Sequence, residues 1–460
     1  MQDPPTNECV TRRTTDIPAQ HSARTSIDLS AVARKYAIVL RIAYLGCIAI
    51  ATLLHLGFDA SLIHAIDRLQ RAIEPALGFK DIVDAARNVA LFLGWGATWV
   101  LTSEAPSRRR DALVATVTGM LASLSVESVQ LFSAFRTASV IDVATNTAGA
   151  LLGALMLWLM ERRAIGDMRR GTMIGIPGWL PASALLLTAF GLAFAPSSRA
   201  SLTVAWVSSP SARARAVSQL AAIDVPWTAL ATDACAWLIV GLFVAVAIDD
   251  RAGRIRWRQL FAWLVLVPGL IVCAHVGRAM VGLMREESSA MVQGVAVAVG
   301  LLLGLLIVPR WRAAVTARST RALHLAMMAA AFGMLMSWSP ANWAARSGAT
   351  AFSWRQLVPM MSLFQRQDLS SVFLVLQKAG LGAAVGACLA ARKRVGEPRP
   401  GLRAAVLYAA VLELGQIFVP GRYPDVTDVL ITGSAACLVA VLIERADRGA
   451  RQSVRLSSRP

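Results

Sequence analysis

The stretch from Glu127 to Gly153 reads E-S-V-Q-L-F-S-A-F-R-T-A-S-V-I-D-V-A-T-N-T-A-G-A-L-L-G, with polar side chains set inside or beside apolar sequence. Its four marked positions are Glu127, Gln130, Arg136 and Asp142. The same residue types recur at the same spacings as Glu413, Gln416, Arg422 and Asp428. Because ionisable residues are rare within apolar helices, this recurrence predicts an internal repeat that carries buried charge.

The composition is typical of a polytopic membrane protein. Only 16% of the 460 residues are charged, and the mean hydropathy is +0.55. Soluble domains carry about 25% charged residues. Apolar runs of about 17–22 residues follow one another, which is the length needed to cross roughly 30 Å of hydrocarbon. The net charge of +18 comes from arginines in short loops, as in cytoplasmic loops of membrane proteins, so it does not indicate nucleic-acid binding.

We expect an all-α fold with about twelve transmembrane helices. The expected spans lie near 36–57, 82–103, 111–132, 140–160, 177–196, 228–248, 259–278, 290–308, 322–339, 370–391, 402–419 and 427–444. Lys and Arg are concentrated in every second loop and in both tails, which predicts that both termini are cytoplasmic. The outer segments 58–81, 197–227 and 340–369 contain apolar residues and tryptophans and are expected to form interfacial helices.

The spans group by four into three tandem units of parallel orientation. The predicted parts are a disordered cytoplasmic tail at 1–35, a first unit at 36–163, a degenerate unit at 164–319, a last unit at 320–445 and a basic cytoplasmic tail at 446–460. In the middle unit Asp233 precedes Gly241 by eight residues, and His275 and Arg278 stand three apart. These residues take the places of the polar positions in the outer units, with the charges reversed.

The first unit resembles the VanZ-like membrane proteins. The resemblance rests on E-x-x-Q at Glu127, on Arg136, and on Asp142-x-x-x-Asn146 with glycines after it. The N-x-x-x-F-x-x-x-G pattern that begins at Asn88 also resembles a helix of that family. The resemblance implies a protein of the bacterial cytoplasmic membrane and cell envelope, linked to low-level resistance to the glycopeptide teicoplanin.

The last unit departs from the family pattern at three positions. They are Lys378 in the place of Asn88, Thr432 in the place of Asn146, and Val439 in the place of Gly153. The candidate site of the first unit is Asn88, Glu127, Gln130, Arg136, Asp142 and Asn146, and that of the last unit is Lys378, Glu413, Gln416, Arg422, Asp425 and Asp428. The degenerate unit offers Asp233, His275 and Arg278. The distribution of Lys and Arg among the loops predicts that the clusters of the first and last units lie toward the extracytoplasmic face.

We expect Glu127 to face Asn88 and Arg136, and Glu413 to face Lys378 and Arg422. A charge at this depth costs roughly 2.5–3.5 kcal/mol on insertion scales, so such groups pair or line a polar cavity. Three interpretations follow. The clusters bind a lipid or glycan-lipid headgroup at the outer leaflet. Alternatively, Glu127 and Glu413 carry protons in a membrane enzyme or proton-coupled transporter. Alternatively, the clusters lock helices together in a structural subunit of an envelope or polysaccharide-export assembly.

The sequence contains no G-x-S-x-G, H-E-x-x-H or Walker motif, so no catalytic class is assigned. The histidines and cysteines show no metal-binding or disulfide spacing, and no metal or cofactor is expected. The expected partners are the lipid bilayer, a headgroup ligand and an envelope protein, with no nucleic acid.

Overall fold

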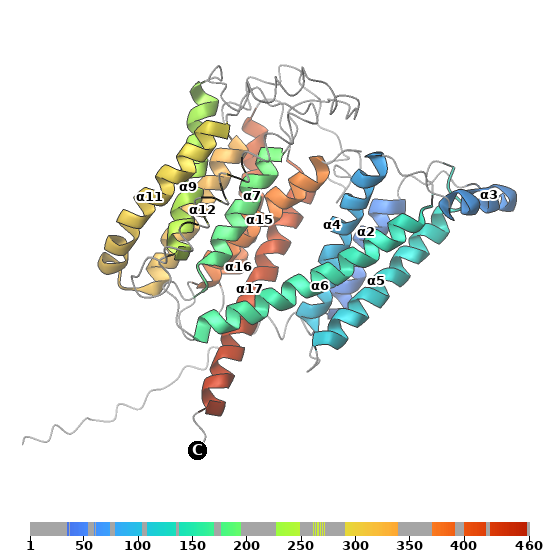
Figure 1. The fold of residues 1–460 in the computed structure, drawn as a ribbon, viewed down its shortest axis with the longest axis horizontal. Helices are drawn as coiled ribbons and strands as arrows, with labels where there is room; N and C mark the ends of the chain where they lie inside the picture. The colour runs from blue at the N-terminus through green and yellow to red at the C-terminus, as the bar shows by residue number, and fades with distance from the viewer. Residues whose placement is uncertain are drawn as a thin grey trace, which may run out of the picture.

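The computed structural model describes residues 35, 37–53, 59, 61–73, 79–103, 108–134, 138–169, 176–194, 227–248, every second residue of 261–271, 290–338, 370–391, 400–419 and 424–457. Within these residues every regular element is a helix, and none is a strand (Figure 1). This confirms the all-helical fold class for the described part of the chain.

The helices fall along the chain as follows. The first group is α2 (Ala37–Leu53), α3 (Leu62–Ile73), α4 (Phe79–Thr102), α5 (Arg108–Gln130) and α6 (Val140–Arg169). The second is α7 (Trp179–Phe194), α9 (Trp227–Ile248) and α11 (Ala290–Ala314). The third is α12 (Arg318–Trp338), α15 (Ser370–Ala391), α16 (Pro400–Gly415), the 3₁₀ helix η3 (Gln416–Phe418) and α17 (Val426–Ser457). Each expected span coincides with one of these helices, apart from 259–278, which is described at only a few positions.

In the described part of the chain, five helices are long and apolar enough to cross a membrane by length and composition. They are Arg109–Gln130, Val140–Arg169, Met291–Ala314, Val372–Ala391 and Val426–Gln452. Shorter apolar helices lie at Ala37–Ala49, Trp179–Ala189 and Ala234–Ile248. Large apolar side chains on α5 and α11 are exposed, as lipid contact would require; examples are Leu113, Leu121, Leu302 and Leu306. The remaining spans, the three-unit arrangement and the cytoplasmic termini stay predictions.

The first and last groups of helices make the same pairwise contacts. In the first, α2 contacts α4 and α5, and α4, α5 and α6 contact one another. In the last, α12 contacts α15 and α16, and α15, α16 and α17 contact one another. Between the groups, α7 packs on α15 and α9 on α12, so the middle helices lie beside the last group (Figure 1).

Glycines allow the closest helix pairs to touch through their backbones. A Cβ on Gly96 of α4 would lie 1.9 Å from the carbonyl oxygen of Ala150 on α6. A Cβ on Gly386 of α15 would lie 2.6 Å from the Cα of Ala436 on α17. Gly241 of α9 makes the corresponding close approach to α11. Small residues at such interfaces are typical of membrane helices, because van der Waals packing largely drives their association.

Two helices are longer than the spans expected from sequence. α6 continues past 160 to Arg169, and α17 continues past 444 to Ser457, so helix extends through most of the expected basic tail. Within this extension Asp447 and Arg451 pair across one turn at 2.8 Å, which supports an exposed helix. The end of α17 projects beyond the other helices (Figure 1).

Arg445 joins α17 to the first group of helices. Its Nε lies 3.1 Å from the Glu161 carboxylate on α6. Its guanidinium also donates to the carbonyl oxygens of Val100 and Leu101, at 2.7 and 2.8 Å. These carbonyls lie in the last turn of α4, where backbone oxygens lack helical partners and a cation is favoured. The long α17 is therefore held both to the end of α4 and to α6.

The close contact between α4 and α6 yields the first prediction. Replacing Gly96 by Val places side-chain atoms against the Ala150 carbonyl, a backbone group that cannot swing aside. We expect a loss of about 1–3 kcal/mol or more of stability, as for other overpacked cores. Thermal unfolding in mild detergent measures the effect. Gly294→Val is the matched control, because nothing lies within 4 Å of a Cβ at Gly294 on α11; equal unfolding temperatures for the two variants would contradict the prediction.

Candidate functional site

The polar cluster of the last group is built around Lys378 on α15. Its Nζ lies 2.5 Å from Oε1 of Glu413 on α16 and 2.7 Å from Oδ2 of Asp428 on α17. All three side chains are buried. The pairing of Glu413 with Lys378 is the contact expected from the sequence, and Asp428 adds a second carboxylate to the same ammonium group.

Glu413 also holds the start of α17. Its Oε2 accepts the backbone N–H of Asp425 at 3.4 Å, and Asp425 caps the helix by accepting the N–H of Thr427 at 2.8 Å. In an ordinary capping box, the acidic residue at the third helical position reaches back to the cap N–H. Here that position is Asp428. Because Glu413 takes the cap N–H, Asp428 can bind Lys378.

The first group contains the same arrangement at the start of α6. Oε2 of Glu127 on α5 accepts the backbone N–H of Ser139 at 2.9 Å. Ser139 caps α6 by accepting the N–H of Ile141 at 3.2 Å. Asp142 takes the third helical position, as Asp428 does in α17, and both carboxylates lie where the helix dipole favours negative charge.

Two further bonds tie this first cluster to neighbouring helices. The amide of Asn146 on α6 donates to Oγ of Ser123 on α5 at 2.8 Å, and both side chains are buried. Nε2 of Gln130 donates to the carbonyl oxygen of Thr52 near the end of α2 at 3.3 Å. Ser123, Glu127 and Gln130 therefore share the face of α5 that meets α6 and α2.

Some buried polar atoms of the two clusters lack a hydrogen-bond partner. In the first cluster this is Oδ1 of Asn146. In the last cluster they are Oδ1 of Asp428 and Nε2 of Gln416. Most buried side-chain polar atoms in proteins are bonded, so each exception suggests a missing partner such as water, an ion or a ligand. Among the described residues, no group of three or more His, Cys, Asp or Glu could hold a metal ion.

The other candidate residues are placed only in part. Asn88 is half-buried on α4. That its side chain faces Glu127 stays a prediction. Asp233 lies on α9, but its side chain is outside the described part of the structure. Four more residues fall outside the described residues: Arg136, Arg422, His275 and Arg278.

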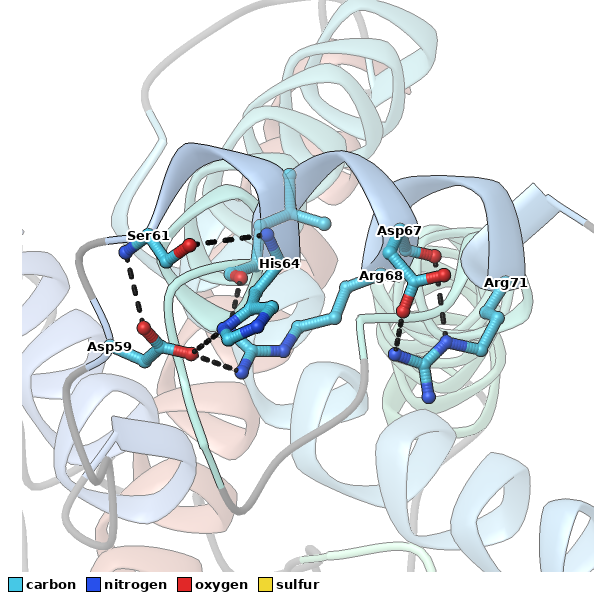
Figure 2. A network of polar contacts seen from close by, with 7 residues as sticks. Asp59, Ser61, His64, Asp67, Arg68 and Arg71 are labelled. Carbon is cyan, nitrogen blue, oxygen red and sulfur yellow. Dashed lines mark hydrogen bonds and ion pairs between the residues drawn. The ribbon is translucent and has the colours of Figure 1, made fainter.

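A further polar network, absent from the expected sites, lies at the start of α3 (Figure 2). Oδ2 of Asp59 lies 2.7 Å from Arg68 and 2.9 Å from Nδ1 of His64. Oδ1 of Asp59 accepts the backbone N–H of Ser61 at 3.1 Å. The sequence signal for this network is weak, because Asp59 and Arg68 belong to no motif and pair only once α3 forms.

The same network fastens α3 to the end of α5. The backbone N–H of Asp59 donates to the Phe132 carbonyl at 2.7 Å, and Arg68 donates to the Leu131 carbonyl at 3.0 Å. These carbonyls follow directly after Gln130. The residues that carry the first cluster are thus held from two sides, by Glu127 at Ser139 and by α3 at Leu131 and Phe132.

α3 itself is amphipathic. Its exposed apolar residues recur at helical spacing as Leu62, Ile66, Leu69 and Ile73, while Ala65 and Ala72 face the protein. Charged Asp67 and Arg71 pair on another face (Figure 2). This pattern fits the interfacial helix expected within 58–81, and its position at a bilayer surface stays a prediction. Apart from Trp227, the segments 197–227 and 340–369 lie outside the described residues.

Removing Lys378 tests the last cluster. Lys378→Met leaves Glu413 and Asp428 buried without their ammonium group, which typically costs roughly 3–5 kcal/mol. Thermal unfolding in detergent should show a large loss, whereas Arg403→Met, at an exposed position of α16, should change little. Lys378→Met combined with Glu413→Gln and Asp428→Asn should recover much of the stability. Wild-type stability of the single variant Lys378→Met would show that the contacts of Lys378 with Glu413 and Asp428 contribute nothing to stability.

The docking of α3 should depend on pH through Asp59. The Ser61 N–H, Arg68 and His64 lower the pKa of the Asp59 carboxyl to about 2 from its usual 3.8. Because the folded pKa is the lower one, the contribution of Asp59 is fully present above about pH 4 and is lost as the pH falls through 2. A nitroxide on Gln70→Cys should therefore gain mobility between pH 4 and pH 2.

Two variants check this pH dependence. Asp59→Asn should make the label mobile already at neutral pH, with little further change on acidification. Asp67→Asn breaks only the exposed pair with Arg71 and should leave the wild-type profile intact. Identical profiles in Asp59→Asn and the wild-type chain would contradict the assignment.

A family model described as VanZ/LLP1 matches residues 41–161. No curated protein and no solved structure matches the chain. The matched range runs from α2 into α6 and includes the carboxylates Glu127 and Asp142. It confirms the VanZ resemblance for the first group of helices, while the copies in the middle and last groups stay predictions. Residues 41–161 of this helical membrane protein thus form a domain similar to the VanZ/LLP1 family.

Proposed function

We propose that this protein is a VanZ-like integral membrane protein of the bacterial cell envelope that binds a lipid or glycan-lipid headgroup at the outer leaflet. The polar clusters at the starts of α6 and α17 would be the binding sites. Both termini would be cytoplasmic, with the clusters toward the extracytoplasmic face. Through the VanZ resemblance, the proposal includes a link to glycopeptide resistance.

The observation that carries this proposal is the presence of buried, unpartnered polar atoms in both clusters. Oδ1 of Asn146 and Nε2 of Gln416 are buried and make no hydrogen bond. In a bilayer such groups usually face a bundle interior or a polar cavity rather than lipid. A headgroup offers both donors and acceptors and would satisfy them. Arg136 and Arg422, which precede α6 and α17 in the sequence, would supply positive charge for a phosphate.

The recurrence of the whole arrangement supports a tandem protein. Glu127 on α5 accepts the cap N–H of α6 at Ser139, and Glu413 on α16 accepts that of α17 at Asp425. The glycine contacts of α4 on α6 and of α15 on α17 also correspond. We therefore propose two VanZ-like units, 36–163 and 320–445, with a degenerate unit between them. The unit 164–319 would carry Asp233, His275 and Arg278.

One observation favours a second candidate function, a membrane enzyme or proton-coupled transporter. Lys378 lies between two buried carboxylates, so the described groups of the last cluster carry one more acid than base. Protonation of Glu413 would balance the charge, as in proton relays of pumps and transporters. Glu127 would have the corresponding role in the first cluster.

Native mass spectrometry of the protein in mild detergent tests the headgroup proposal. We expect a co-purifying lipid in the wild-type chain and its loss in the Arg136→Ala, Arg422→Ala double variant. Arg109→Ala, Arg110→Ala is the matched control, because it removes two exposed arginines at the opposite end of α5. This control should keep the lipid.

Two results would overturn the proposal, and a third would favour the second candidate function. Equal lipid retention in all three proteins would show that the arginine-bearing ends are not the binding sites. Absence of any retained lipid, with a less stable double variant, would favour a structural role in an envelope assembly. Loss of pH-dependent activity in Glu127→Gln and Glu413→Gln, with lipid retained, would favour the transporter or enzyme.

A further inference from the structure

We propose that α3 binds the bilayer surface through its apolar side chains alone, so that the contact does not select anionic lipids. In this arrangement the helix lies flat on the membrane at the level where α5 ends. The contact lies outside both polar clusters, so the inference goes beyond the headgroup binding proposed above. Three features of α3 carry it: the distribution of its side chains, its attachment to α5, and the pairing of its arginines.

The exposed apolar residues of α3 lie on one side of the helix. Successive residues of an α-helix are turned by about 100°. Four residues therefore fall within about 60° of one another and form the apolar stripe: Leu62, Ile66, Leu69 and Ile73. Between 46% and 68% of each of these residues is exposed, and Ile63, which borders the stripe, is 79% exposed. A continuous row of exposed aliphatic side chains on a short helix marks a contact surface.

The remaining residues of α3 divide into a protein-facing and a water-facing side. Ala65, Arg68 and Ala72 share the first of these sides, where both alanines are buried and the Arg68 side chain is 13% exposed. Asp67 and Arg71 lie roughly opposite the apolar stripe, and their side chains are mostly exposed. A helix that lies at a bilayer surface beside a protein requires these three sides, which meet lipid, protein and water.

The attachment of α3 places it where the apolar part of α5 ends. The segment Arg109–Gln130 is apolar and long enough to cross a membrane, and large apolar side chains are exposed along it. Directly after this segment, the Leu131 carbonyl accepts from Arg68 at 3.0 Å and the Phe132 carbonyl accepts the N–H of Asp59 at 2.7 Å. From there α3 projects away from the other helices (Figure 1). The bilayer interface is the occupant that this position favours, because the lipid around α5 ends there.

The charges of the α3 region balance within the protein. Oδ2 of Asp59 lies 2.7 Å from Arg68, and Asp67 pairs with Arg71 (Figure 2). Among the described residues of this region, two aspartates thus balance two arginines. Basic amphipathic helices gain part of their membrane affinity from anionic lipids. Because α3 offers no net positive charge, its apolar side chains must provide the contact.

A flat α3 also sets the level of the lipid headgroups relative to the first cluster. The N–H of Leu131 donates to the carbonyl of Glu127 at 3.1 Å, so Glu127 lies one helical turn before the attachment point of α3. One turn corresponds to about 5.4 Å along the helix axis. Glu127 therefore lies within about one turn of the membrane surface that α3 contacts.

Single nitroxide labels on the complete protein test the inference, in a chain whose six native cysteines are replaced by alanine. Ile66→Cys and Leu69→Cys place the label on the apolar stripe, and Asp67→Cys and Arg71→Cys place it on the opposite side. In vesicles of phosphatidylcholine, power-saturation EPR compares collisions with oxygen, which concentrates in lipid, and with a water-soluble nickel chelate. We expect oxygen to dominate at Ile66 and Leu69, and the nickel chelate to dominate at Asp67 and Arg71.

Anionic lipid tests whether charge contributes to the contact. Replacing part of the phosphatidylcholine by phosphatidylglycerol should leave the depth of the Leu69 label unchanged. Asp67→Asn frees Arg71 from its pair, so in this variant the same label should shift deeper as the fraction of phosphatidylglycerol rises. The matched control is Asp67→Asn combined with Arg71→Gln, which removes both charges and should again show no shift.

Three results would overturn the inference. Dominance of the nickel chelate at Ile66 and Leu69 would place the apolar stripe in water. Immobile labels with few collisions with either reagent would show that a second copy or another protein covers the stripe. A deeper Leu69 label with phosphatidylglycerol in the chain without Asp67→Asn would show that charge contributes. Each result leaves the headgroup function to its own test, the lipid lost in the Arg136→Ala, Arg422→Ala variant.

Discussion

The structure depends on how α6 and α17, the last helices of the first and last groups, begin. In a bilayer the first backbone N–H groups of a helix must find partners within the protein. Glu127 and Glu413 supply one such partner by accepting the N–H of Ser139 and Asp425. A carboxylate from the preceding helix thus fixes the turn between the two helices and the register of the next one. The second acid, Asp428 at the third helical position of α17, binds Lys378 instead of the cap N–H.

That second acid connects packing with chemistry. In the last group Asp428 binds Lys378, so the capped end of α17 is also held to α15. The backbone contact at Gly386 fixes how closely the two helices approach. The residue on α15 that reaches this acid is Lys378. In the last cluster Lys378 thus joins both acids, while Glu413 accepts the cap N–H of α17 and the Gly386 contact brings α15 and α17 together.

Much of this architecture could be predicted from the sequence, because membrane helices are recognised by the length of their apolar runs. The helix Trp227–Ile248 was expected at 228–248, and Lys378 was expected to face Glu413. The brace between Arg445 and Glu161 could not be predicted, because it joins residues 284 positions apart that belong to no motif. The Asp59 network could not be predicted for a related reason, because its contacts form only once α3 lies against the end of α5. The extension of α17 to Ser457 was not predicted, because its polar sequence is typical of a disordered tail. In the structure Asp447 and Arg451 pair across one turn of this extension.

The contrast between the two clusters bears on whether buried charge here is structural or functional. A buried ion pair rarely adds much stability over apolar residues, although breaking it is costly. In the Lys378 cluster the ammonium group and both carboxylates come from the protein itself, so the cluster can hold helices together without a ligand. The first cluster, which lies within the range that matches the VanZ/LLP1 family, has Asn88 at the sequence position that corresponds to Lys378. The two clusters thus share a glutamate that accepts the cap N–H of the following helix, whereas only in the last cluster does the structure show a lysine that joins two acids from different helices.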